Sequence, residues 1–251
     1  MDFTTSPWPE GCRAALSLTF DDGHSSQLER AFPIMQERGL RGTFYVLPRG
    51  DKWREALEEW RPVYEAGNEI GNHSLSHTCS RGFSDNPQAR GLEGLTLQDV
   101  EEDVMEAERR LAEVFPTEDR SYCYPCYQNH VGEGETRQSY TPIIARHFAA
   151  GRGLGEWPNH PATCDLHYAW SWALRGNSAT ELIGMAEQTA NRGRWGIMTF
   201  HGISLGHLSV AECDFTELCN HLTHAKHIWV APVREVAVAI REWRVREGIA
   251  R

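Results

Sequence analysis

Strand-like apolar runs and amphipathic helix-like segments alternate along almost all of this 251-residue chain. Residues 14–20 have the continuous apolar character of a buried strand, and residues 25–38 follow with apolar side chains on one helical face. The chain shows no internal repeat, low-complexity tract or linker. This alternation predicts a single α/β domain with a parallel sheet, either open or closed into a barrel.

The later elements are predicted from periodicity and from helix-start signals. Three capping boxes are expected, beginning at Thr96, Ser178 and Ser209, and the helix after Thr96 has the clearest period. Residues 78–94 and 128–139 are rich in turn formers and predict loops. Further strands are expected at residues 43–47, 69–71, 121–124, 149–153, 196–200 and 228–231, and further helices at 55–66, 141–148, 178–191, 209–225 and from 232 onward.

Composition excludes several classes of partner. The formal charge of −10 disfavours nucleic acid and anionic membrane surfaces. No apolar run approaches the ~20 residues that a membrane span needs. The first residues lack a basic start and an apolar core, which predicts a cytoplasmic protein as the sequence stands, or a periplasmic or secreted one if a leader was removed.

The seven cysteines are odd in number and have no framework-like spacing, which favours reduced thiols. Cys123 and Cys126 also form a Cys-x-x-Cys pair. A redox role for that pair is the alternative, although such motifs normally open a helix near the start of a βαβ unit.

Polar residues gather at the ends of the predicted strands. Asp21 and Asp22 end the first strand, and His73, Tyr124 and His201 each stand at or just after the end of another. The carboxyl ends of parallel strands form the active face of α/β folds. Four separate segments are therefore expected to deliver chemical groups to one rim.

Asp22, His73 and His77 offer a carboxylate and two imidazoles to one metal ion. The two histidines stand four residues apart and are expected on one face of a helix. Three protein ligands leave a fourth position for water, which is the layout of a catalytic zinc site. The alternative is an ordinary Asp-Gly turn and a solvated histidine pair.

Three motifs resemble those of the NodB-homology polysaccharide deacetylases, also called carbohydrate esterase family 4. They are residues 19–23 (TFDDG), 73–77 (HSLSH) and 200–202 (FHG). The resemblance extends over a core from about residue 14 to about residue 240 of a single 1–251 domain. It implies a deformed (β/α) barrel that uses a divalent metal, most suitably Zn²⁺, to remove acetyl groups from carbohydrates.

The resemblance also assigns roles to individual residues. It implies that Asp21 is the general base, that Asp22, His73 and His77 bind the metal, and that His201 is the general acid. The backbone N–H of Cys126 is expected to hold the oxyanion of the substrate, and Tyr124 is expected to belong to the same substrate-binding group of residues.

The sequence departs from the family pattern at three positions. Cys123 stands where many members have an arginine that pairs with the base, and Arg152 is the candidate replacement. Asp165 is the candidate to polarise His201 in place of the fourth-motif aspartate. Thr199 replaces a leucine of the last motif, so Met198 or Trp195 is expected to line the acetyl pocket instead.

The predicted function is a metal-dependent hydrolase that removes N-acetyl groups from N-acetylglucosamine-type sugars or O-acetyl groups from an oligo- or polysaccharide. One alternative is a small-molecule amide or cyclic-amide hydrolase of the same fold, resembling the allantoinases. The other is a non-catalytic carbohydrate-binding relative, which would need neither Asp21 nor His201. The expected partner is the acetylated carbohydrate, and nothing in the sequence indicates an oligomeric state.

Overall fold

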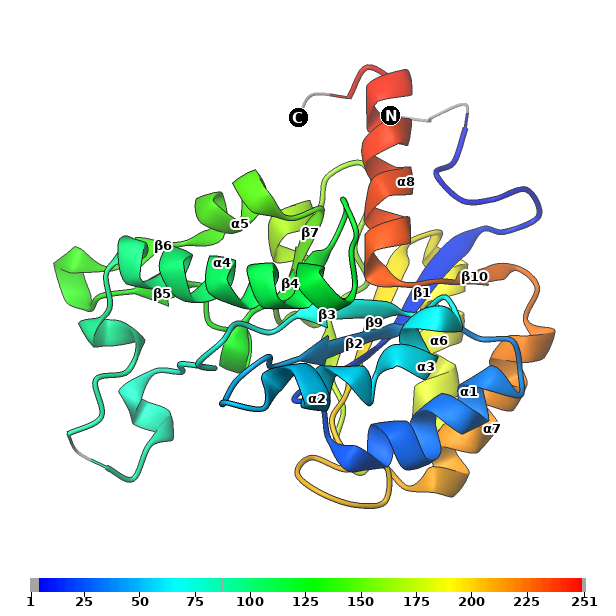
Figure 1. Ribbon diagram of the computed structural model, residues 1–251. Helices are drawn as coiled ribbons and strands as arrows, with labels where there is room; N and C mark the ends of the chain where they lie inside the picture. The colour runs from blue at the N-terminus through cyan, green and yellow to red at the C-terminus, as the bar shows by residue number, and fades with distance from the viewer. Residues whose placement is uncertain (1–4, 87, 250–251) are drawn as a thin grey trace.

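The computed structural model describes residues 5–86 and 88–249 and contains a curled parallel sheet surrounded by helices (Figure 1). The strand order is β7-β4-β3-β2-β1-β9-β8, and β10 pairs with the half of β1 that β2 leaves free. The parallel strands are β1 (Ala14–Phe20), β2 (Thr43–Val46), β3 (Glu69–Asn72), β4 (Ser121–Cys123), β7 (Ala150–Arg152), β8 (Trp172–Ala173), β9 (Trp195–Phe200) and β10 (Ile228–Val230).

One short segment nearly closes the sheet into a barrel. Ala169 bridges Arg152 of β7, while Trp172 and Ala173 a few residues later pair with β9. The Gly153 N–H also donates to the carbonyl of Ala169. The segment from 169 to 173 therefore joins the two edges of the sheet, which confirms the predicted deformed barrel.

Helices cover the outside of the curled sheet (Figure 1). They are α1 (Phe32–Gln36), α2 (Trp53–Glu58), α3 (Arg61–Glu65), α4 (Leu97–Val114), α5 (Thr141–His147), α6 (Ala179–Arg192), α7 (Glu212–His224) and α8 (Val233–Arg246). A π-helical turn, Gln27–Ala31, precedes α1, and a small hairpin of β5 (His130–Val131) and β6 (Gln138–Ser139) lies in the predicted loop 128–139. None of the helices in the described residues is long and apolar enough to cross a membrane.

The capping boxes at Thr96 and Ser178 are confirmed, because both side chains accept the N3 backbone N–H. The third one is wrong. Helix α7 starts at Glu212, whose N–H donates to Ser204 Oγ instead of Ser209. The expected helix 55–66 is also divided into α2 and α3, because Pro62 has no N–H to continue the α2 hydrogen bonds.

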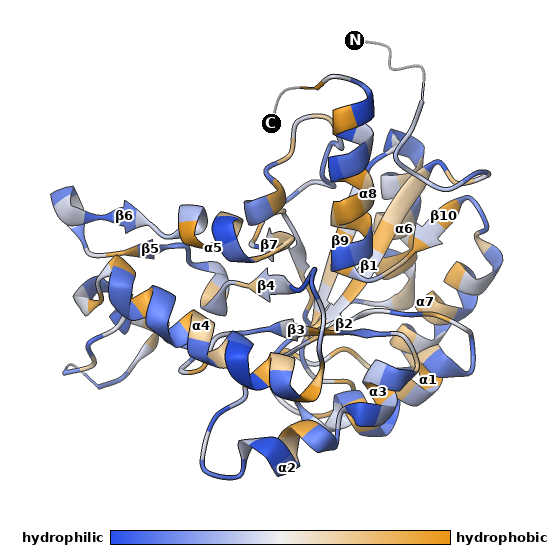
Figure 2. Ribbon diagram, turned by 45° about the horizontal axis from the view of Figure 1, so that its top comes forward, coloured by the Kyte–Doolittle hydropathy of each residue, from blue (hydrophilic) through white to orange (hydrophobic). Residues whose placement is uncertain are grey.

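Strand β1 forms the centre of the molecule. All seven of its residues are buried, and its colour in Figure 2 is largely that of hydrophobic residues. Leu16, Leu18 and Phe20 pack with the helices in the largest core cluster. Thr19 occupies the opposite face, since alternate strand residues point to opposite sides. This buried strand fixes the position of Asp21 and Asp22, which follow directly at its carboxyl end.

Candidate active site

Asp22, His73 and His77 converge at the carboxyl ends of β1 and β3. Asp22 Oδ1 lies 3.3 Å from Nε2 of His73 and 3.3 Å from Nε2 of His77. One ligand atom from each residue lies within 4.8 Å of the other two. Asp22 has a left-handed backbone with φ of 71°, which turns its carboxylate toward the loop that follows β3. The structure therefore brings together the three residues predicted to bind one metal.

The predicted helix carrying the two histidines is absent. Residues 73–80 form a loop instead, and both Ser74 (φ 64°) and His77 (φ 53°) have left-handed backbones that a right-handed helix excludes. The Asp103 carboxylate of α4 accepts hydrogen bonds from the N–H groups of Leu75 and Ser76. A side chain from another element thus replaces the helical hydrogen bonds that the spacing alone suggested.

The hydrogen bonding of His73 identifies which ring nitrogen is available to a ligand. His73 is buried, and its Nδ1 lies 3.0 Å from the carbonyl oxygen of Cys123. A carbonyl can only accept, so Nδ1 carries a proton and Nε2 is the ring nitrogen that faces Asp22. In the absence of a metal, Nε2 can donate a proton to the carboxylate, and in the neutral ring its lone pair is available to a cation between the two residues. Two imidazole nitrogens and one carboxylate are a donor set that suits zinc.

Asp22 is ionised in this arrangement. Partial burial would raise the pKa of Asp22, but the hydrogen bonds and charges of His73 and His77 hold it well below its usual value. The side chain of Asp22 is 38 % exposed, whereas that of His73 is 1 % exposed. The cluster is therefore rigid on the protein side and open on the side from which a substrate would arrive.

Asp21 is paired with Arg152, the arginine that the sequence analysis selected. Arg152 Nη2 lies 2.5 Å from Asp21 Oδ2, and both side chains are almost fully buried. Nη1 donates to Ser171 Oγ at 3.0 Å and to Thr199 Oγ1 at 2.8 Å. Although burial alone lowers the pKa of Arg152, the neighbouring Asp21 carboxylate and Cys123 raise it well above its ordinary value.

The register of the sheet explains how Arg152 reaches this position. Strands β4 and β7 pair with Cys123 opposite Arg152. Cys123 occupies the position of the expected third-motif arginine, and its small side chain contacts both Arg152 and Asp21. The guanidinium thus comes from the adjacent strand rather than from the motif itself.

His201 follows β9 and faces both aspartates. Its Nε2 lies 3.9 Å from Asp21 Oδ2 and 4.0 Å from Asp22 Oδ2. Burial lowers the pKa of His201, and the charges of Asp21 and Asp22 offset only part of that effect. The amide of Gln27 donates to the backbone carbonyls of Asp21 and His201, at 2.5 Å and 2.9 Å. Sequence analysis did not identify this buried cross-link.

Asp165 does not contact His201, so that expected pairing is wrong. His201 Nδ1 is buried and has no hydrogen-bond partner in the described part of the chain. Asp165 instead caps a short turn, Leu166–Tyr168, where its carboxylate accepts the N–H of His167. Its side chain is 60 % exposed, as an ordinary surface carboxylate would be.

The structure also places the expected pocket residues elsewhere. Tyr124 is buried and its hydroxyl donates to the carbonyl of His167. Met198 points toward the helices with the main core, since even-numbered residues of β9 face that side. Trp195 lies at the opposite end of β9 from His201, with its Nε1–H donating to Ser17. The side chains of Met198 and Trp195 thus serve packing instead of lining an acetyl pocket, and that of Tyr124 is likewise part of the packed interior.

Tyr127 and a disulfide complete the rim, and neither was predicted. The Tyr127 ring lies with its centroid 5.3 Å from the Arg152 guanidinium, and its buried hydroxyl has no partner among the described residues. Cys79 and Cys126 are joined by a disulfide, so the expectation of reduced thiols is wrong for this pair. Cys123 is free, which also excludes a Cys123–Cys126 redox pair in this structure. No spacing in the sequence signals this pairing, because the two cysteines are 47 residues apart.

Comparisons with known proteins agree with the motifs. The family model described as polysaccharide deacetylase matches residues 10–131. YxkH of Bacillus subtilis (strain 168), provisionally named a polysaccharide deacetylase, is 22% identical over 148 residues, which are 57% of this chain and 49% of that protein. The match thus spans about half the length of this curated relative.

Two solved structures are similar over nearly their whole length. One, from Mycobacterium smegmatis and also provisionally named a polysaccharide deacetylase, has a TM-score of 0.67 at 17% identity and covers 96% of this chain and 95% of its own. The other, a family 4 acetyl xylan esterase from Clostridium thermocellum in complex with a cobalt ion, has a TM-score of 0.55 at 15% identity and covers 94% and 93%. These likenesses confirm the fold.

Proposed function

We propose that this chain, a member of the polysaccharide deacetylase family by its N-terminal sequence and its fold, is a metal-dependent deacetylase of carbohydrates. The substrates would carry N-acetyl groups of the N-acetylglucosamine type or O-acetyl groups. One observation carries the proposal: the Asp22–His73–His77 cluster lies beside a buried carboxylate, Asp21, and an imidazole, His201, whose Nε2 faces both aspartates. Binding alone would need neither a base nor an acid beside the ligand cluster.

Asp22, His73 and His77 would hold the metal. A divalent cation there, most suitably zinc, would supply Lewis-acid polarisation of the acyl carbonyl and of water. A cobalt ion in the acetyl xylan esterase structure supports a divalent site in this fold. The carbonyl of Cys123 fixes His73 for this task by accepting its Nδ1–H.

Asp21 would act as the general base. Arg152 occupies one oxygen of the Asp21 carboxylate, Oδ2, while the other, Oδ1, is buried and has no partner among the described residues. Oδ1 is therefore the atom available to accept a proton from the attacking water. The pairing with Arg152 gives the buried carboxylate a charge partner and fixes its orientation.

His201 would then act as the general acid. Once water has added to the acyl carbon, the bond from carbon to the amine must break, and the nitrogen needs a proton as it leaves. His201 Nε2 faces the space between the two aspartates and supplies that proton, which gives acetate and a free amine. The lowered pKa of His201 makes its protonated form a stronger donor.

The Cys126 N–H is proposed to stabilise the oxyanion. Cys126 has a left-handed backbone with φ of 51° in the short turn that follows β4. The N–H groups of the next two residues close this turn on Tyr124 and Pro125. A backbone donor fixed in this way stabilises developing negative charge without reorganisation.

Replacement of His201 by alanine should distinguish a leaving-group acid from a binding residue. We expect turnover of an N-acetyl substrate to fall by roughly 10²–10⁴-fold, because an amine is a poor leaving group without a proton. An activated aryl acetate, whose leaving group needs no proton, should lose much less. Acetate release from both substrates measures the difference, and equal losses would argue against the acid role.

Replacement of His73 by alanine should release the metal. It removes a buried ligand whose orientation is fixed by Cys123, and the two remaining side chains are partly exposed. Only two of the three proposed protein ligands would remain. We therefore expect metal content after dialysis to fall from about one ion per chain to near zero. A His224→Ala variant, changed on the exposed end of α7, is the control. Unchanged metal content in His73→Ala would exclude His73 as a ligand.

Substrate class is best tested by direct acetate release. A panel of chitooligosaccharides, acetylated xylan, peptidoglycan fragments and small amides, assayed with and without a chelator, separates the alternatives. Activity on a carbohydrate that the chelator abolishes is the expected result. Activity confined to small or cyclic amides would favour the amide-hydrolase alternative, and binding without release would favour a non-catalytic protein.

A further inference from the structure

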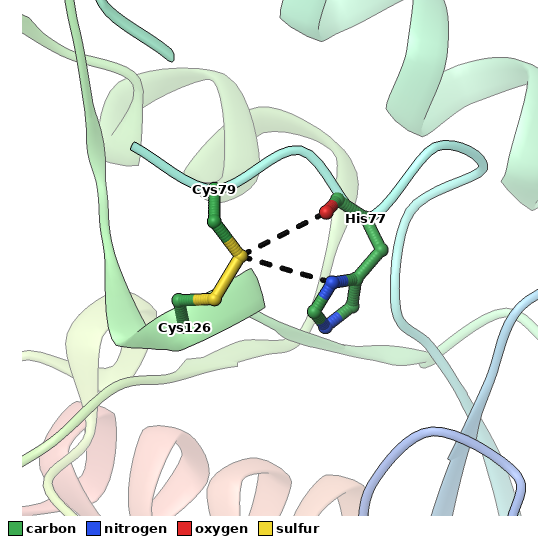
Figure 3. A group of neighbouring side chains, drawn as sticks. All are labelled: His77, Cys79 and Cys126. Carbon is green, nitrogen blue, oxygen red and sulfur yellow. Dashed lines mark hydrogen bonds between the residues drawn. A yellow bond between two sulfur atoms is a disulfide. The ribbon is translucent and has the colours of Figure 1, made fainter. Parts of the chain in front are cut away.

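The Cys79–Cys126 disulfide joins two segments that meet at the proposed active site (Figure 3). Cys79 lies in the loop that carries His77, and Cys126 lies in the short turn that follows β4. The two cysteines are 47 residues apart in the sequence, with their Cα atoms 5.8 Å apart. The bond therefore attaches a metal-binding loop to the segment that follows β4.

His77 lies between this disulfide and the proposed metal cluster. Its Nε2 is 3.3 Å from Asp22 Oδ1, while its Nδ1 is 3.8 Å from the sulfur of Cys79 (Figure 3). His73 differs, because a carbonyl oxygen fixes its protonated nitrogen. The Nδ1 atom of His77 instead faces the sulfur of Cys79. That sulfur belongs to a disulfide when oxidised and would be a thiol when reduced.

The reduced cysteines would provide a different set of ligands. One ligand atom from each of His77, Cys79 and Cys126 lies within 4.8 Å of the other two. A disulfide sulfur is a poor metal ligand, but thiolates together with imidazole form strong zinc sites. Two candidate metal sites, one oxygen- and nitrogen-based and one thiolate-based, therefore share His77.

We propose that reduction of the Cys79–Cys126 disulfide creates a second metal site from His77, Cys79 and Cys126, which competes with Asp22 and His73 for His77. A neutral imidazole has one lone pair. When Nδ1 of His77 uses that lone pair on a thiolate-bound metal, Nε2 carries the proton and cannot bind beside Asp22. The disulfide thus keeps His77 available to the proposed catalytic centre.

The redox step balances with an ordinary thiol or phosphine reductant. A dithiol transfers two electrons and two protons to the disulfide and becomes a disulfide itself. A trialkylphosphine does the same with water as the source of oxygen and becomes the phosphine oxide. The two thiols then lose their protons to the buffer when the metal binds.

Cobalt substitution tests the site without reference to turnover. The metal-free chain receives one equivalent of Co²⁺, before and after reduction by a trialkylphosphine, and its absorption spectrum is recorded. We expect a thiolate-to-cobalt charge-transfer band in the near ultraviolet only after reduction. Cys79→Ser with Cys126→Ser should abolish the band, whereas Cys213→Ser, changed at an exposed free cysteine, should retain it.

Two results would overturn the proposal. One is a reduced wild-type chain that binds Co²⁺ without the band. The other is a band that persists in the double serine variant, since it would then arise from another thiol such as the buried Cys123.

The consequence for turnover, which rests on the proposed function, is measured separately. With one equivalent of metal, reduction should lower acetate release by the wild-type chain at least about 10–100-fold, because loss of a residue that only supports a ligand already costs that much and here the ligand His77 itself is withdrawn. Reoxidation should restore it, and Cys213→Ser should behave like the wild type. If the band appears but the oxidised chain releases no acetate from any substrate, the proposed function fails while the second site stands.

Discussion

Replacement of Asp21 by asparagine should reduce deacetylation by roughly 10²–10⁴-fold while the metal stays bound. Asparagine keeps the shape of the side chain but cannot accept a proton from water at Oδ1. The proposed ligands Asp22, His73 and His77 are unchanged, so metal content should remain at the wild-type level. Steady-state acetate release and metal analysis after dialysis measure the two quantities on the same sample.

Asp165→Asn is the matched control for this experiment. It makes the same chemical change at an exposed carboxylate that contacts His167 and not His201. We expect its turnover to equal that of the wild type. Retained turnover in Asp21→Asn would instead show that another group accepts the proton, and loss of metal in that variant would show that Asp21 supports the ligand cluster.

The fold was largely predictable because its determinants are local. The continuous apolar run of β1 and the apolar spacing of α4 need no knowledge of distant residues. The capping boxes at Thr96 and Ser178 are local in the same sense. The expected cap at Ser209 was wrong because Ser204, a residue outside the pattern, supplies the acceptor for the first N–H of α7.

The prediction of the candidate site was right for residues placed by strand ends. It was wrong for residues placed by contacts with distant parts of the chain. Asp22 and His73 each follow a buried strand, so parallel pairing brings them together. The loop around His77 was missed because Asp103, which holds it, comes from α4. The Cys79–Cys126 bond joins residues 47 positions apart, and sequence spacing carries no direct signal of such a pairing.

The errors at Met198 and Trp195 have a different cause. Both residues were placed near His201 because they precede it closely in the sequence. In a strand, however, alternate side chains point to opposite faces. Met198 consequently faces the helices, while Thr199, the next residue, faces the opposite side and contacts Arg152. Trp195 lies on the same side as Thr199 but at the start of β9, far along the strand from His201. Proximity in sequence gave the right strand, but the wrong face for Met198 and the wrong end for Trp195.

Replacement of Arg152 by methionine should have the largest effect on stability. Arg152 is fully buried, and its loss leaves the Asp21 carboxylate buried without its charge partner. Breaking such a pair costs about 3–5 kcal/mol of the free energy of unfolding. Urea denaturation measures this change. Arg152→Lys should recover only part of it, because an ammonium cannot match the planar contacts that the guanidinium makes with Asp21, Ser171 and Thr199.

A double-mutant cycle separates charge pairing from packing at this position. In an Asp21→Asn background there is no carboxylate for Arg152→Met to leave unpaired, and the substitution also removes a buried guanidinium that has already lost its charge partner, so Arg152→Met should cost less by about 0.5–3 kcal/mol, the coupling range of residues in contact. The hydroxyls of Ser171 and Thr199 lose their donor in both backgrounds, so that cost cancels in the cycle. If the two substitutions prove additive, Arg152 acts through packing. The orientation of Asp21 must then come from Gln27, which holds its backbone carbonyl.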